Sequence, residues 1–231
     1  MSDRSTTFDD HDPLAYSILQ VLEDFIDEVG SRECTAHFDK VVDGKYFLKG
    51  KHLIQKPERF TEEHLVFPML RRAFGYSLRP QPMQYAPRWP RGGGVPDFCI
   101  TSIPIAAAME SDLRFFGEVK PPKKIENARN DMVNYLDSDL DVHAVAILTD
   151  GFEWEIWIRP KGESVDDLDN PYAKASLRDS LKTVRTRNMK TAPYQPHRVR
   201  NNIDTDIFSD FMLDAVLETI ETEFGVDTTA F

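Results

Sequence analysis

Apolar side chains recur every three or four positions in four segments, which is the spacing of one face of an α-helix. These segments are 13–29, 61–74, 125–138 and 204–224. In the second segment Thr61 is the expected N-cap, and Pro68 either kinks the helix or marks its first turn. Basic side chains at four-residue intervals predict a further helix near 172–184.

Apolar runs and period-two alternation predict the strands. Four segments show these patterns: 95–103, 112–120, 142–151 and 152–158. The third is nearly continuous in apolar residues, as in a strand buried on both faces. Residues 35–56 are less regular, and we interpret them as a short hairpin around Asp43-Gly44. Strands followed by helices indicate an α/β protein.

The length of 231 residues suits one sizeable domain rather than two independent cores. Hydrophobic residues make up 41% of the chain, but no apolar run approaches the roughly 20 residues that cross a bilayer. The first fifteen residues are polar and acidic, unlike a secretory signal, and the two cysteines form no disulfide framework. We expect a cytoplasmic protein without a membrane partner.

The net charge of −11 argues against nucleic acid as a partner, because phosphates repel an acidic surface. The charge is unevenly spread, however. Residues 174–200 contain eight basic side chains and one acidic side chain. An acidic body with one basic tract keeps nucleic acid among the expected partners.

The candidate catalytic residues lie at the ends of two predicted strands. Asp97 begins one strand, and Glu118 and Lys120 end the next, two residues apart and therefore on one face. If these strands pair, two carboxylates and one ammonium share a small site, and two close carboxylates repel unless a proton or a cation intervenes. Mg²⁺, or Mn²⁺ in its place, suits such a site, and the backbone carbonyl of Val119 is a further candidate ligand.

These residues resemble the PD-(D/E)XK phosphodiesterase superfamily, in which P-D is followed about twenty residues later by E-x-K. The matching positions are Pro96, Asp97, Glu118 and Lys120. Three further stretches resemble the N-terminal nuclease domain of type I restriction R subunits: EEHLVFPMLRRAFGY, ARNDMVNYL and AILTDGFEWEIW. The resemblance covers roughly residues 58–160. One position departs from it, since Asp131 stands where RecB-type nucleases carry Gln.

The resemblance implies a restriction-endonuclease-like fold: a central mixed β-sheet flanked by helices, here with an added N-terminal helix and a C-terminal helical extension. Within one domain, it divides the chain into an N-terminal helical and hairpin elaboration (1–57), a nuclease core (58–160), and a basic helix, linker and amphipathic helix (161–231). It also implies a Mg²⁺-dependent nuclease acting on nucleic acid, with DNA the expected substrate, in restriction, defence or repair. In this interpretation Asp97 and Glu118 would bind the metal, Lys120 would assist the attacking water or the transition state, and Glu62 or Glu63 would support them.

Several basic residues are candidates for contacting nucleic acid. They are Arg88, Arg91, Lys123, Lys124, Lys174, Arg178, Lys182 and Arg185. For the last four, a solvated face that balances nearby acids is an equally good interpretation.

Two other functions stay open. One is a catalytically silent nucleic-acid-binding or assembly subunit with the same fold, which the acidic surface and Asp131 favour. The other is a protein-interaction subunit of a larger defence complex, or a homodimer, that docks through the C-terminal helix.

Overall fold

The protein is an α/β structure built on one six-stranded mixed sheet. The structure, a computed structural model, describes residues 12–80, 95–188 and 203–231. The strands follow their sequence order across the sheet: β1 (Leu78–Pro80), β2 (Phe98–Ile100), β3 (Leu113–Val119), β4 (His143–Thr149), β5 (Glu153–Arg159) and β6 (Ala173–Ser176). Strands β3 and β4 run parallel, and the other neighbouring pairs in this sheet are antiparallel. The expected mixed sheet flanked by helices is thereby confirmed.

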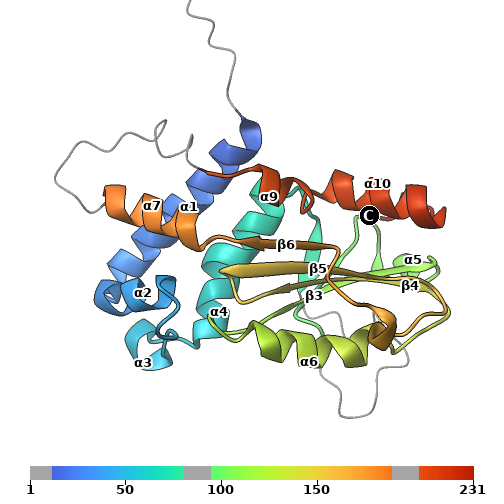
Figure 1. The fold of residues 1–231 in the computed structure, drawn as a ribbon, viewed down its shortest axis with the longest axis horizontal. Helices are drawn as coiled ribbons and strands as arrows, with labels where there is room; N and C mark the ends of the chain where they lie inside the picture. Colours follow the sequence, from blue (N-terminus) through green and yellow to red (C-terminus); the bar gives the residue numbers. More distant parts are fainter. Residues whose placement is uncertain (1–11, 81–94, 189–202) are drawn as a thin grey trace, which may run out of the picture.

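Helices cover both faces of the sheet. Before β1 come α1 (Pro13–Ser31), α2 (Thr35–Val42), α3 (Gly50–Leu53), α4 (Pro57–Thr61) and two π-helical segments, η1 (Glu62–Val66) and η2 (Met69–Ala73). After β2 come α5 (Ile105–Ala108), α6 (Ile125–Leu136), the 3₁₀ turn η3 (Val165–Asp167), α7 (Arg178–Asn188), α9 (Asp206–Ser209) and α10 (Leu213–Phe224). Figure 1 shows α6 below the sheet, α9 and α10 above it, and α1, α2 and α7 together at one side.

The alternating side chains of β3 divide the core into two parts. Phe115 and its neighbours on one face pack with α1, the π-helical segments and α10. Phe116, on the other face, packs with Ala128, Met132 and Tyr135 of α6. Glu118 has the same parity as Phe116, so it lies on the face that α6 covers. None of the described helices is both long and apolar enough to cross a membrane.

Four local predictions are wrong. Residues 35–56 form α2 and α3 instead of a hairpin, because Phe38, Val41 and Val42 bury one helical face. Thr61 is not an N-cap: the helix begins at Pro57, and the Thr61 hydroxyl donates to the carbonyl of Pro57 within it.

The third error concerns the basic segment near 172–184. Its first part is the edge strand β6, and a helix begins only at Arg178. Lys174 therefore lies on a strand and shares no helical face with Arg178 and Lys182. The predicted linker 191–202 lies outside the described residues. The fourth error is the single helix expected over 204–224, because Met212 is extended and divides the segment into α9 and α10.

A close approach of two strands fixes the geometry at the end of β3. Gly117 lies directly opposite Phe98, and a Cβ atom at Gly117 would come within 2.0 Å of the Phe98 ring. The Phe98 ring is fully buried, so it has little room to move aside. The glycine allows β2 to lie close to β3, one residue from both Asp97 and Glu118.

We expect Gly117→Ala to lower the free energy of unfolding by about 1–3 kcal/mol, the usual cost of overpacking a core. Gly30→Ala is the control, since nothing lies within 4 Å of a Cβ there and helix propensity favours alanine. Urea unfolding followed by circular dichroism measures both. Equal stability of the two variants would contradict the proposed contact.

Candidate functional site

Asp97 and Glu118 lie next to each other across the β2–β3 pair. Phe98 pairs with Gly117, so the residues one position outward are Asp97 and Glu118. The backbone N–H of Val119 donates to Asp97 Oδ2 at 2.7 Å, which ties the loop before β2 to the end of β3. The sequence placed these carboxylates on two strands, and the antiparallel register brings them together.

Lys120 connects this pair to α6. Its ammonium forms ion pairs with Glu118 and, at 2.8 Å, with Asp131 Oδ2. Asp131 lies on the helix that packs over this face of the sheet, one turn before Tyr135. The residue that departs from the nuclease pattern is therefore the one that holds the Lys120 side chain.

Burial gives the Glu118 carboxylate an unusual state. Its side chain is only 5% exposed, and its Oε2 atom has no hydrogen-bond partner among the described residues. Burial raises the pKa of Glu118, and the charge of Asp97 raises it further, while the hydrogen bond and charge of Lys120 oppose the shift. Protonation of one carboxyl group, or binding of a cation, removes the repulsion between Glu118 and Asp97.

The pKa of Asp97 is also raised, first by burial and then by two acids from the α4–η1 helix, Glu62 and Glu58. The Val119 N–H and Lys120 oppose this shift. Burial lowers the pKa of Lys120, but its hydrogen bonds to Asp131 and Glu118 outweigh burial and raise it. Lys120 therefore stays protonated at neutral pH.

The two predicted supporting glutamates differ in their surroundings. Glu62 is nearly buried and accepts from the Arg59 guanidinium at 2.8 Å, and burial raises its pKa. Glu63 is 39% exposed and is bonded to Gln55 and Arg59, which lower its pKa. Of the two, Glu62 is the one whose charge acts on Asp97.

The helix that carries Glu62 is held against the β4–β5 turn. Gly151, with φ of +86°, closes this turn, and a Cβ atom there would come within 2.1 Å of the Thr61 methyl group. The adjacent Asp150 accepts the N–H of Lys123 at 2.6 Å, so the same turn holds the segment that follows Lys120. One turn thus positions chain on both sides of the site.

Two residues that contribute to the electrostatics of this site, Glu58 and Tyr135, were not among the site residues predicted from the sequence. Burial raises the pKa of the Tyr135 hydroxyl, and the charges of Glu118 and Asp131 raise it further. The signal for Tyr135 was present, since it lies one helical turn beyond Asp131. Glu58 gave no signal, because the helix was expected to begin at Thr61.

The donor set fits a divalent cation with two protein carboxylates. The described residues contain no group of three or more His, Cys, Asp and Glu side chains arranged to hold a metal. Mg²⁺ needs fewer, since it commonly takes one or two carboxylates together with water and substrate phosphate. The unpartnered Glu118 Oε2 beside Asp97 is such an arrangement.

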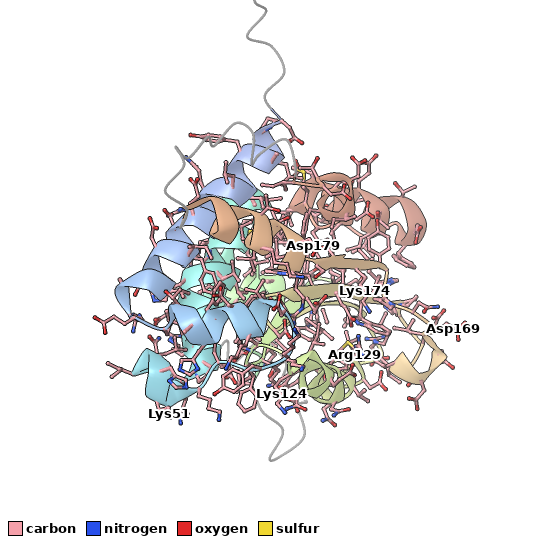
Figure 2. All side chains as sticks on the ribbon, turned by 60° about the vertical axis from the view of Figure 1, so that its left-hand side comes forward. Lys51, Lys124, Arg129, Asp169, Lys174 and Asp179 are labelled. Carbon is pink, nitrogen blue, oxygen red and sulfur yellow. The ribbon has the colours of Figure 1, made fainter. Side chains whose placement is uncertain are left out.

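Three cations of the predicted basic tract have described side chains, and all three lie close to acids. Lys174 lies 3.7 Å from the buried Glu155, which Arg129 of α6 also binds, and Figure 2 shows Arg129 and Lys174 on one side of the molecule. Arg178 pairs with Glu153 at 2.5 Å, and Lys182 pairs with Asp179 at 3.4 Å.

Three more predicted contacts lie outside what the structure describes. Arg88 and Arg91 fall between the described segments, and of Arg185 only the backbone, within α7, is described.

A separate hollow of about 520 Å³ lies at the other end of β2 from Asp97. Its lining includes Arg71, Tyr76, Arg79 and Thr101. It is not part of the carboxylate site, because Thr101 and Asp97 flank opposite ends of the strand.

The comparisons with known proteins do not identify a family for this chain. No family model matches the chain, and no curated protein or solved structure matches it either. The case for a functional site therefore rests on the burial, register and ion pairs of Asp97, Glu118, Lys120 and Asp131.

We expect the stability of the metal-free protein to fall as pH rises from about 4.5 to 8, because the pKa of Glu118 increases from 4.5 to about 8 on folding. In this range the folded state binds more protons than the unfolded state, so each rise in pH favours unfolding. Mg²⁺ replaces the proton, so it stabilises at pH 8 and has little effect near pH 5. At a hundredfold excess over the dissociation constant, the gain is about 2.7 kcal/mol.

Thermal unfolding with MgCl₂ or EDTA measures both effects. Glu118→Gln abolishes the metal response, whereas Glu126→Gln, on the exposed side of α6, retains it. A melting temperature at pH 8 that does not respond to metal would contradict this cation site.

Proposed function

We propose that the chain is a Mg²⁺- or Mn²⁺-dependent nuclease with a restriction-endonuclease-like fold, hydrolysing phosphodiester bonds in nucleic acid, with DNA the expected substrate. The observation that carries the proposal is the buried Glu118 carboxylate, with one oxygen unpartnered among the described residues, beside Asp97 and Lys120. The order of a strand bearing the acid, a strand ending in E-x-K, a covering helix and a parallel strand supports the fold.

Asp97 and Glu118 would hold the cation. When bound there, a divalent cation neutralises charge on the phosphodiester and lowers the pKa of a bound water. Val119 keeps Asp97 in place through its N–H, and the low exposure of Glu118 excludes competing water from that carboxylate. Charge interactions in such a water-poor site are stronger than at the surface.

Lys120 acts as a fixed positive charge. Its raised pKa makes it a poor proton acceptor, so it serves by stabilising negative charge on the phosphoryl oxygens in the transition state. Asp131 is a positioning residue, because its ion pair holds the ammonium beside Glu118. Tyr135, on the same helix, adds a neutral hydroxyl near both acids.

A catalytically silent nucleic-acid-binding or assembly subunit is the second candidate. Asp131 favours it, since an ammonium held by two carboxylates has less charge to offer a substrate. The two candidates differ in turnover alone, which an assay decides.

We expect the wild-type protein to cut plasmid or single-stranded DNA with Mg²⁺ or Mn²⁺ and to be inactive in EDTA. Glu118→Gln removes a metal-binding charge and Lys120→Ala removes a transition-state contact, so each reduces the cleavage rate by at least about a hundredfold. Gel or fluorescence assays of the initial rate provide the measurement.

Glu126→Gln and Lys161→Ala are the matched controls, because both side chains lie on exposed surfaces in ion pairs. They should cut at the wild-type rate. Metal-dependent cutting that survives both Glu118→Gln and Lys120→Ala would overturn the site, and binding without cutting by the wild type would favour the silent subunit.

A further inference from the structure

The segment between α2 and α4 carries a basic and aromatic surface that the sequence did not single out. Residues 44–57 contain four lysines and no acid, in a chain with a net charge of −11. Two aromatic residues, Tyr46 and Phe47, stand among these lysines. We call Tyr46, Phe47, Lys49, Lys51 and Lys124 the Phe47 patch.

Both aromatic rings of the patch lie close to cations, and that of Phe47 is exposed to solvent. Phe47 is 40% exposed, and its ring stacks near that of Tyr46 at 6.0 Å between centroids and 21° between planes. The Lys49 ammonium lies 5.1 Å from the Tyr46 ring centroid and 6.0 Å from that of Phe47. Lys124 approaches Phe47 at 5.5 Å from a different part of the chain.

The cations of the patch have no acidic ion-pair partners among the described residues. None of Lys49, Lys51 and Lys124 forms an ion pair with a carboxylate in the described part of the chain. On α7, by contrast, Arg178 and Lys182 both have acidic partners. Binding to phosphates gains most from cations that are not already paired, because those are the charges that displace counterions.

The patch borders the proposed nuclease site. Lys124 follows Lys120 by four residues, just before α6. The intervening Lys123 is fixed by its backbone bond to Asp150. Figure 2 shows Lys51 and Lys124 on the same lower edge of the molecule, at α3 and at the start of α6.

We propose that the Phe47 patch binds an unpaired stretch of a nucleic-acid strand, with a base stacked on Phe47 and the flanking phosphates contacted by Lys49, Lys51 and Lys124. The choice of ligand rests on the proposed function; the location and the single-stranded form go beyond it. An exposed aromatic face flanked by unpaired cations is the combination that binds single strands, because each base offers a π-face and each nucleotide a phosphate. In a duplex the base faces are covered by their neighbours.

Fluorescence anisotropy with the full chain in EDTA tests binding without cleavage. The probes are labelled oligothymidylate, an abasic strand of equal length and a duplex. We expect Phe47→Ala to weaken oligothymidylate binding about fivefold to a hundredfold, the range of one base–aromatic stack. Phe47→Tyr restores it, and wild type binds the abasic strand and the duplex more weakly than oligothymidylate.

The controls are matched by residue type and exposure. Tyr16→Ala removes a 48% exposed aromatic side chain from α1 and should leave binding unchanged. Lys49→Gln should reduce the slope of log affinity against log salt by about 0.7, whereas Lys161→Gln, which removes a cation paired with Asp112, should not.

Equal affinity of wild type and Phe47→Ala, or of the intact and abasic strands, would overturn the proposal. Binding to phosphatidylserine vesicles without binding to oligonucleotide would overturn it as well. If Phe47→Ala cuts in a metal-dependent way and binds the strand as tightly as wild type, the nuclease proposal is supported and the proposed role of the Phe47 patch is overturned. If Phe47→Ala weakens strand binding but the wild-type protein never cuts, the role of the patch is supported and the nuclease proposal is overturned.

Discussion

Two carboxylates buried side by side at the end of β2 and β3 are the constraint on which this structure depends. Moving one charged carboxylate out of water is costly, and placing a second beside it costs more. Neighbouring groups offset part of this cost. Val119 donates its N–H to Asp97, Lys120 neutralises Glu118, and one oxygen of Glu118 stays without a partner among the described residues.

The rest of the fold holds that arrangement in place. Gly117 lets β2 approach β3 closely enough for Asp97 to lie next to Glu118. Asp131 links Lys120 to α6, which packs on the same face of the sheet. The β4–β5 turn contacts the Glu62 helix through Gly151 and the segment after Lys120 through Asp150. Residues far apart in sequence therefore converge on one end of the sheet.

The two basic surfaces differ in whether their cations are paired with acids. In the tract that looks basic in sequence, the cations with described side chains, Lys174, Arg178 and Lys182, are paired with acids of β5 and of α7 itself. The Phe47 patch has fewer basic residues, but its lysines, Lys49, Lys51 and Lys124, form no ion pair with a carboxylate in the described structure. Formal charge along a sequence is thus a poor guide to the field at a surface, because salt bridges form between neighbours in space.

The strands and the main helices could be predicted because their patterns are local. The apolar run of β4, the alternation of β5 and the stripe of α1 each follow from which side chains face the core. Residues 35–56 were mistaken for a hairpin because Asp43-Gly44 resembles a turn, whereas packing of Phe38 and its neighbours favours a helix. The helix start at Pro57 was missed for a similar reason: Thr61 has the right chemistry for a cap, but its hydroxyl bonds within the helix.

The sequence by itself determined which residues are chemically suited to the candidate site: Asp97, Glu118 and Lys120, on strands whose period places the last two on one face. Only the tertiary structure decided their state. The strand register set Asp97 beside Glu118, and burial raised the pKa of both acids. Packing of α6 gave Asp131 its partner. These depend on contacts between distant segments, since desolvation and ion pairing are properties of the surroundings and not of the residue.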